Sequence, residues 1–564
     1  MVNESGGPPV ATRLIATRTL AAIAIANGLS FSLSNALLLP VALIPLVYIA
    51  ALACSGWMMY QARPRRTHNS PGGLAWTIGL GFAVALSLPR LVYPLEWLPG
   101  HTVDAMFDDY ARLAELASML YSGEYPLRHP ANSGLLMAFY YAAFYPMALL
   151  KQLLPFITLK DAIFIGSALY FVLLGCSLVE VSHRLLPDRA SALVLLFLCT
   201  WFGGLDWVFG DFLPFHVHSE WWARRFFEKP SQWSGFLTAS QWTVHHFLGF
   251  YLCVLAWVFL RYSRFRQHWL KPVLIPLLLI AALFHSPFGF LPAVLLGLAW
   301  LPLLWRRFLF RWSTLALLLV TIAPLYVFTG RLAGSALQIQ LASLGHGEYG
   351  AVASFFSYLA LLPLVDLAAI PFLVLLLWSR LQVMEKWLWL GAFAFFTSTF
   401  FIYVPLFNNY SMRGLLLPAF VFFLLFARHW RQLPPLLART SLVVIVLLGG
   451  MGGLREAVSG SRYALWASSM ARQEFLGLPD HPPHYADLKK QARDGSHHLL
   501  VPRDKAYRRL RPYLGEKLLP DVPPEKFRNM EREIAGRAYA GRRYSGRPSD
   551  SVQGNEQPPA NGKH

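Results

Sequence analysis

Long apolar runs separated by short polar loops recur along the first 456 residues, and they set the structural class of the chain. Runs of about 18 or more apolar residues are typical of transmembrane helices, because that length crosses the hydrocarbon core of a bilayer. The pattern predicts an all-α polytopic membrane protein. It predicts about 13 spans, near 15–33, 36–60, 74–95, 161–182, 190–206, 241–261, 272–285, 288–305, 313–330, 353–379, 387–406, 415–427 and 441–456.

The composition agrees with this class. Of the 564 residues, 55% are hydrophobic and only 14% are charged, against roughly 25% charged residues in soluble domains. The formal net charge of +19 does not indicate nucleic-acid binding. Much of the basic excess lies in short loops, where it orients membrane helices and contacts anionic lipid.

The basic loops predict which side of the membrane faces the cytoplasm. They are 61–66, 183–189, 261–271, 306–311, 380–386 and 427–440. The loops expected on the opposite side are 96–132, 206–240, 330–352 and 406–414.

Residues 135–154 are apolar enough to span, but a span there would separate two of the basic loops. We therefore expect an aromatic-rich helix at the outer interface, where Tyr and Trp concentrate. The alternative is that 135–154 spans and another weak run does not.

The hydrophobic signal stops near residue 456, which divides the chain into a transmembrane domain, 1–456, and a polar tail. Residues 457–538 contain enough Leu, Tyr and Pro for a small extracytoplasmic appendage. The last segment, 539–564, is rich in Gly, Pro, Ser, Asn and Arg and is predicted to be disordered.

The first large outer loop, 96–132, is acidic although the whole chain is basic. Asp104 and Asp108 are four residues apart and share a face if the loop is helical, with Asp109 beside them. A carboxylate held at a membrane boundary has its pKa raised by desolvation and becomes a better general base. The alternative interpretation is a solvated acidic face on a surface helix.

The second outer loop and the start of the next span carry another polar set. Arginine pairs suit phosphate groups, and ionisable residues at membrane depth usually mark a site. For the aromatic residues of this set, anchoring at the membrane interface is the alternative. The candidates are Glu220, Arg224, Arg225, Gln241, Trp242, His245 and His246.

Two short outer turns complete the candidate site. His285 lies in the turn HSPFGF (285–290), and Asn408, Asn409 and Arg413 lie in NNYSMRG (408–414). An arginine that enters a membrane helix is costly unless an acid or a phosphate pairs with it. Snorkelling of its side chain to the interface is the alternative.

The acidic loop resembles the first outer loop of the GT-C superfamily of integral-membrane glycosyltransferases. The residues that carry the resemblance are Asp104, Asp108, Asp109, Tyr110, Arg112, Ala114, Gly123, Tyr125 and Pro126. The resemblance implies a GT-C-like bundle with outer-face interfacial helices and a small C-terminal outer domain. It also implies an inverting enzyme that takes sugar from a polyprenyl-phosphate donor, at the periplasmic face of a bacterial cytoplasmic membrane.

Within this resemblance, Asp104, Asp108 or Asp109 acts as general base on a lipid or glycan acceptor of the envelope. Arg112 and the polar residues of the second loop and outer turns bind substrate, with Arg413 on the departing phosphate. No metal ligand is assigned, and a divalent cation (Mg or Mn) is left open as cofactor. Rival interpretations are an O-antigen ligase or polymerase, a lipid or polysaccharide transporter, and a non-catalytic assembly protein.

Overall fold

The computed structural model describes the parts of the chain that form the helical bundle, and the statements below concern those parts. They are residues 14–64, 70–92, 116, 128–129, 132–136, 141–157, 159–205, 233, 235–242, 244–265, 269–304, 340–341, 351–403 and 413–458.

Helices dominate the described residues. Their bounds are α1 Ile15–Ala36, α2 Ile44–Gln61, α3 Gly73–Val92, α5 Tyr145–Leu153, α6 Leu159–Leu185, α7 Arg189–Leu198, α9 Phe236–Trp242, α10 Val244–Tyr262, α11 Leu270–His285, α12 Pro287–Leu304, α14 Ala351–Val365, α15 Ile370–Leu376, α16 Val383–Phe401, α18 Leu416–His429 and α19 Pro435–Val444, the last continuing through a π-helical turn, Ile445–Gly449.

Three short antiparallel strand pairs connect loops of this bundle. They are β1 (Ala62–Pro64) with β4 (Ser263–Phe265), β2 (Arg128–His129) with β3 (Asn132–Leu136), and β5 (Gln340–Leu341) with β6 (Ile402–Tyr403).

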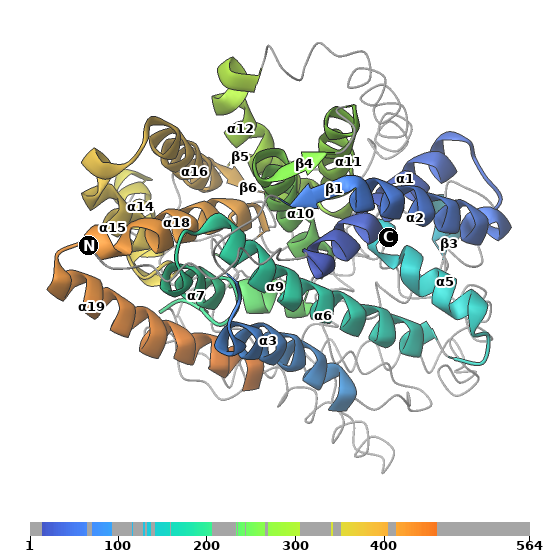
Figure 1. The fold of residues 1–564 in the computed structure, drawn as a ribbon, viewed down its shortest axis with the longest axis horizontal. Coiled ribbons are helices and arrows are strands. Elements are labelled where there is room, and N and C mark those ends of the chain that lie inside the picture. Colours follow the sequence, from blue (N-terminus) through green and yellow to red (C-terminus); the bar gives the residue numbers. More distant parts are fainter. Residues whose placement is uncertain are drawn as a thin grey trace, which may run out of the picture.

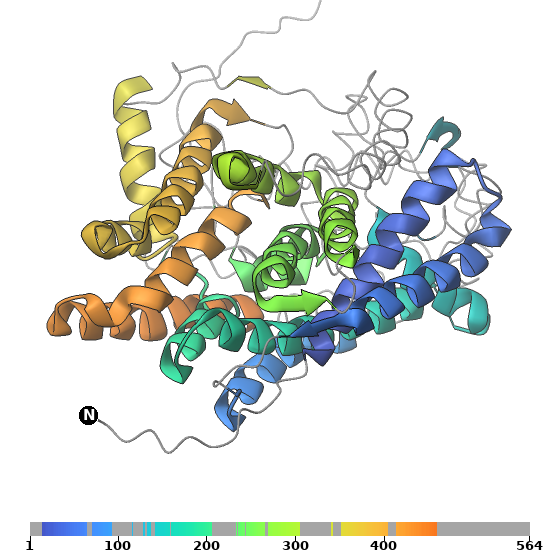
Figure 2. The same cartoon turned by 45° about the horizontal axis from the view of Figure 1, so that its top comes forward.

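Helix α10 lies near the middle of the bundle. The α1–α2 hairpin (blue) lies to one side of it, and α14 and α16 (yellow to brown) lie to the other (Figures 1 and 2). It packs against α11, α12, α18 and α6 and is buried along almost its whole length. A helix that is apolar all round is expected in such a central position.

Four of the described helices are long and apolar enough to cross a membrane: 44–61, 162–185, 244–262 and 435–458. Large apolar side chains also face outward, including Leu46, Val84 and Leu447, each at least 60% exposed. Such surfaces are costly in water but suit contact with lipid chains. The helical class is therefore confirmed, and the four apolar helices are compatible with a membrane protein. The total of about 13 spans stays a prediction.

Loops expected on one side of the membrane do contact one another. Strand β1 pairs with β4, which joins loops 61–66 and 261–271. Arg184 donates to the Tyr262 carbonyl at 3.0 Å. Arg431 and Asp188 form an ion pair at 3.3 Å, which adds loop 427–440. On the other side, β5 and β6 link residues 340–341 with 402–403. These contacts agree with the grouping of the loops.

The start of α1 is held by a carboxylate from α6. Its N-cap residue is Leu14, which makes no side-chain cap. Instead the Glu180 carboxylate accepts from Ala16 N at 3.2 Å, Thr17 N at 2.9 Å and Thr17 Oγ1 at 2.6 Å. The first N–H groups of a helix have no partner within the helix, and a carboxylate also complements the positive end of the helix dipole.

The expected span 353–379 is wrong as a single helix. It breaks between Val365 and Ile370 into α14 and α15. Pro363 weakens the last turn of α14, and Pro371 favours a new helix start because proline lacks an N–H. Between them Ala368 and Ala369 are left-handed, with φ of 47° and 59°.

Two other expected elements are shorter than the apolar runs that predicted them. Helix α7 ends at Leu198, and the chain then turns, with Gly204 at φ 87°. The expected interfacial helix 135–154 overlaps the last two residues of β3 and contains a 3-10 helix, Tyr141–Phe144, that leads directly into α5, of 9 residues. Together these two helical segments rise about 22 Å, which is less than the roughly 30 Å of hydrocarbon in a bilayer.

Candidate functional site

The histidine pair lies at the start of α10, as the sequence suggested. His245 and His246 are buried, and their ring centroids are 4.2 Å apart. The centroid of the His246 ring is 6.2 Å from the centroid of the Phe288 ring. Its Nδ1 is 2.7 Å from Ser286 Oγ, in the turn between α11 and α12. This contact joins the mouth of α10 to the HSPFGF turn.

Ser286 fixes both its own turn and the histidine. Its Oγ accepts the Gly289 N–H at 3.0 Å, and Pro287 is the first residue of α12. Serine followed by proline is a favoured way to begin a helix. Ser286 Oγ and His246 Nδ1 share a hydrogen bond, and the His246 tautomer decides which of the two atoms donates.

His285 belongs to a buried network that joins α11, α1 and α6. Its Nδ1 donates to the Ala281 carbonyl at 2.7 Å, so Nε2 is left to accept from Asn27 Nδ2 at 3.1 Å. Asn27 Nδ2 also donates to Tyr170 Oη at 2.8 Å, and Tyr170 donates to the Ala143 carbonyl at 2.9 Å. The network holds His285 in its neutral form and fixes its ring.

Helices α10 and α12 meet at glycines, which is what allows the His246–Ser286 contact. A Cβ on Gly249 would lie 2.5 Å from Ser286 Cβ. A Cβ on Gly289 would lie 2.7 Å from Phe250 N and 3.2 Å from the His246 carbonyl oxygen. Both distances are shorter than carbon contacts allow, so the helices pack this closely only with glycine at these positions.

Arg413 lies beside the same turn. It directly precedes Gly414. A Cβ added to Gly414 would lie 3.7 Å from the Phe288 carbonyl oxygen and 2.8 Å from the ring of Phe395. The Arg413 residue is half-buried, just before α18 begins at Leu416. The structure thus brings the starts of α10, α12 and α18 together around residues 285–289.

The candidates therefore divide into two sets. His245, His246, His285 and Arg413 gather at this turn, and Gln241 and Trp242 lie at the end of α9, next to the histidines in the chain. The other candidates lie outside the described residues, and their positions relative to the turn stay predictions. They are Asp104, Asp108, Asp109, Arg112, Glu220, Arg224, Arg225, Asn408 and Asn409.

In the part of the chain that the structure describes, no three His, Cys, Asp or Glu side chains are grouped so that they could hold a metal ion. The four cysteines are free thiols. The divalent cation that the sequence left open stays a prediction.

Two partners of the histidines, Ser286 and Asn27, were missed by sequence reasoning, and so was Tyr170, which bonds to Asn27. Ser286 carried a usable signal, because serine before proline and three residues before glycine is typical of a helix start. Asn27 is a lone amide within an apolar run, which also marks a polar contact inside a membrane bundle. Tyr170 has no such signal, because tyrosines are frequent throughout this chain.

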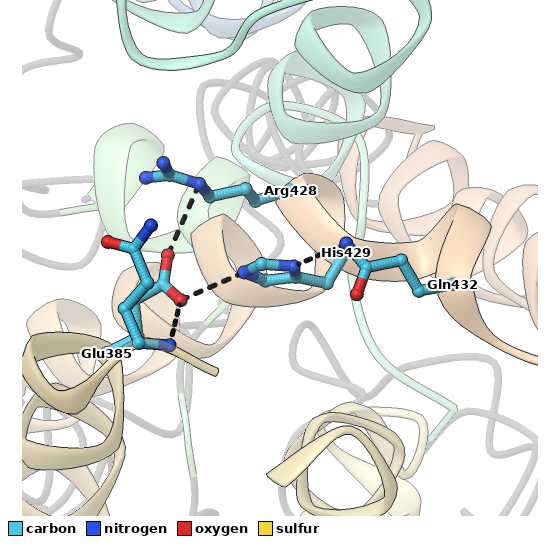
Figure 3. Close-up of polar contacts among 5 residues, drawn as sticks. Glu385, Arg428, His429 and Gln432 are labelled. Atoms are coloured by element: carbon cyan, nitrogen blue, oxygen red, sulfur yellow. Dashed lines mark hydrogen bonds and ion pairs between the residues drawn. The ribbon is translucent and has the colours of Figure 1, made fainter. Parts of the chain in front are cut away.

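A second polar cluster lies at the opposite, basic end of the bundle (Figure 3). Glu385, in the first turn of α16, contacts His429 Nε2 at 3.1 Å and Arg428 Nε at 3.2 Å, and accepts from Gln382 N at 2.9 Å. Gln432 Nε2 donates to His429 Nδ1 at 3.1 Å. The cluster ties the start of α16 to the end of α18.

Charge and hydrogen bonding lower the pKa values of two acids at this end. Burial alone would raise the pKa of Glu385, but bonds from His429 and Gln382 and the charges of His429 and Arg428 outweigh it. The pKa of Asp188 is lowered in the same way. Burial alone would raise it, but hydrogen bonds from Ser191 and the charge of Arg431 outweigh the effect of burial. Both acids are therefore structural anions, which explains these contacts without a catalytic role.

No protein-family model matches this chain, and no curated protein or solved structure matches it either.

Proposed function

We propose that the protein is an inverting membrane glycosyltransferase of the GT-C type. It moves a sugar from a polyprenyl-phosphate donor to an envelope acceptor, at the periplasmic face of a bacterial cytoplasmic membrane. The observation that supports the proposal best is the meeting of His246, His285 and Arg413 around the α11–α12 turn. Polar and ionisable groups buried among membrane helices are costly, and they usually mark a site.

The location of this turn favours a lipid-linked substrate. It lies at the ends of α10, α11, α12 and α18 that are opposite the basic loops. A polyprenyl chain would lie among the helices while its phosphate and sugar lie at the helix ends. A water-soluble donor would need no such placement, because its phosphate could be bound in an aqueous loop.

The proposed roles follow from the chemistry of sugar transfer. A departing polyprenyl phosphate is an anion, so electrostatic stabilisation matters more than protonation. Arg413 lies just before the N-terminal end of α18 and supplies a positive charge to the phosphate. The positive end of the α18 helix dipole also favours an anion at this place. In the proposal Arg224 and Arg225 add to this positive charge, and the imidazole ring of His246 contacts the donor. The acceptor hydroxyl loses its proton to Asp104, Asp108 or Asp109.

The direct test replaces Asp104, Asp108 and Asp109 singly by Asn and measures transfer from a polyprenyl-phosphate sugar in nanodiscs. We expect one substitution to lower kcat by roughly 100-fold to 10,000-fold, the usual contribution of a general base, and the other two to have small effects. Asp188→Asn, at the basic end of the bundle, is the matched control and leaves transfer unchanged. Wild-type activity in all three variants refutes the assignment of the base.

A second experiment tests whether Arg413 binds the donor phosphate. Arg413→Ala is expected to weaken donor binding and slow transfer, and Arg413→Lys to restore part of both, since lysine keeps the charge but not the planar fork. A protein that moves the intact lipid-linked sugar across vesicles without cleaving it would instead be a transporter. One that accepts only a preassembled glycan would be a ligase or polymerase.

A further inference from the structure

Asp366 is a buried acid at the break between α14 and α15, and the candidate site above does not include it. It is 3% exposed, and its Oδ2 accepts a hydrogen bond from Trp233 N at 3.2 Å. The following residues, Ala368 and Ala369, hold left-handed backbone conformations that side chains rarely adopt. A buried acid together with strained backbone is a combination found at functional positions.

The partner of Asp366 lies just before α9, and α9 folds back along α10. Phe236, the first residue of α9, stacks on Phe250 with ring centroids 5.3 Å apart, and it also lies 5.8 Å from Phe247. The two helices therefore form a hairpin, and the histidine pair lies at the start of its second helix, α10. The expected boundary between a loop 206–240 and a span from 241 is wrong at this point, because residues 236–240 are already helical and buried.

This hairpin starts deep in the bundle. Phe250 lies about 18 Å from Tyr262 along α10, at 1.5 Å per residue, and Tyr262 is at the basic end. The hydrocarbon core of a bilayer is about 30 Å thick. Phe236 stacks on Phe250, and Trp233 contacts Phe236, so both residues lie near the middle of the hydrocarbon core.

Two further chain segments meet Asp366 at this depth. Leu205 N donates to the Val365 carbonyl at 2.8 Å, and Gly203 N donates to the Gly449 carbonyl at 3.0 Å. The ring of Trp233 packs against Phe202 at a centroid distance of 6.1 Å. Irregular backbone inside a membrane protein persists only where protein groups or a polar cavity satisfy it. Asp366 supplies one such group.

We propose that Asp366 is a positioning residue for the histidine pair. Its carboxylate holds the start of α9, and the α9–α10 hairpin carries that constraint to His245 and His246. The inference rests on the proposed function for the role of the histidines. The Asp366 side-chain oxygen is the acceptor that the buried Trp233 N–H needs, so it can hold this irregular segment in place. Without it, the Trp233 N–H is buried and unsatisfied, which is costly.

The experiment compares Asp366→Ala, which removes the acceptor, with Asp366→Asn, which keeps an oxygen for the Trp233 N–H. Hydrogen–deuterium exchange in nanodiscs is measured for peptides covering 235–248, alongside sugar transfer. Glu385→Ala is the matched control. It also removes a buried carboxylate that accepts a backbone N–H at a helix start, but in the cluster of Figure 3.

We expect Asp366→Ala to raise exchange in 235–248 and to lower kcat about 10-fold or more, since small misplacements of site groups are expensive in rate. Asp366→Asn is expected to stay within about 3-fold of wild type in both measurements, because it keeps the hydrogen bond. Glu385→Ala should raise exchange at the start of α16 and leave both 235–248 and transfer unchanged.

Unchanged exchange in 235–248 for Asp366→Ala overturns the inference. So does a loss of transfer in Asp366→Asn as large as in Asp366→Ala, since the charge would then take part in the chemistry. Raised exchange with full transfer also overturns it. If the wild-type protein transfers no sugar, the proposed function fails, and the exchange comparison still decides whether Asp366 holds the hairpin.

Discussion

Replacing Gly249 by alanine tests whether the close packing of α10 and α12 holds His246 against Ser286. The new Cβ would lie 2.5 Å from Ser286 Cβ and 3.1 Å from Ser286 N. Carbon atoms in favourable contact lie about 3.5 Å apart or more, so the helices must separate by about 1 Å. Both clashing atoms are held by the backbone, and side-chain rotation therefore cannot relieve the clash.

The separation also breaks the polar contact. His246 Nδ1 and Ser286 Oγ are 2.7 Å apart, and a shift of about 1 Å takes them past the limit of a hydrogen bond. Overpacking costs about 1–3 kcal/mol, and the lost bond about 0.5–1.5 kcal/mol. Alanine returns up to about 1 kcal/mol through its higher helix propensity. The net expectation is destabilisation by about 0.5–4.5 kcal/mol, together with reduced sugar transfer.

The matched control is Gly297→Ala, on the same helix α12. No atom of the described structure lies within 4 Å of a Cβ at Gly297, so this variant should be neutral or slightly stabilised. Thermal unfolding in nanodiscs measures stability, and the transfer assay measures function. Equal behaviour of Gly249→Ala and Gly297→Ala would refute the packing argument.

Two predictions concern the other polar clusters. The folded-state pKa of Glu385 is lowered from its ordinary value of 4.5, so its stabilisation is complete above that value and is lost as the pH falls below it. The difference in Tm between wild type and Glu385→Gln should therefore shrink as the pH is lowered from 7 to about 4, and a constant difference would contradict this assignment. Tyr170→Phe leaves Asn27 and the Ala143 carbonyl without the buried hydroxyl, and should lower stability by about 1–3 kcal/mol in thermal unfolding. Tyr48→Phe removes the hydroxyl of another buried tyrosine, one that is not among the hydrogen-bonded groups Asn27, His285 and Ala143, and a loss as large as that of Tyr170→Phe would show that these hydrogen bonds add nothing.

Helices such as α1, α6 and α10 could be located from the sequence, because the need to cross a bilayer imposes a local run of apolar residues. The break at Asp366 could not be located in this way. Its flanking prolines are visible, but the contact that fixes it joins Trp233 and Asp366, which are 133 residues apart. Composition does not encode which distant backbone N–H an acid will meet.

The candidate site shows the same division. His245, His246 and His285 were identifiable because ionisable groups are expensive at membrane depth and are therefore rare there. Their partners were not, since Ser286 is 40 residues from His246 and Asn27 is 258 residues from His285. Helix packing, set by close approaches such as Gly249 against Ser286, brings each pair together.

By itself the sequence determined the helical class, and it predicted which runs cross a membrane and which loops lie on the same side of it. These follow from local transfer energies, of apolar runs into lipid and of basic loops kept out of it. Only the tertiary structure decided that α9 folds back along α10, that Asp366 holds its start, and that three helix ends meet beside His246. These depend on how helix surfaces fit together, and that fit is a property of pairs of distant segments that no single run of residues specifies.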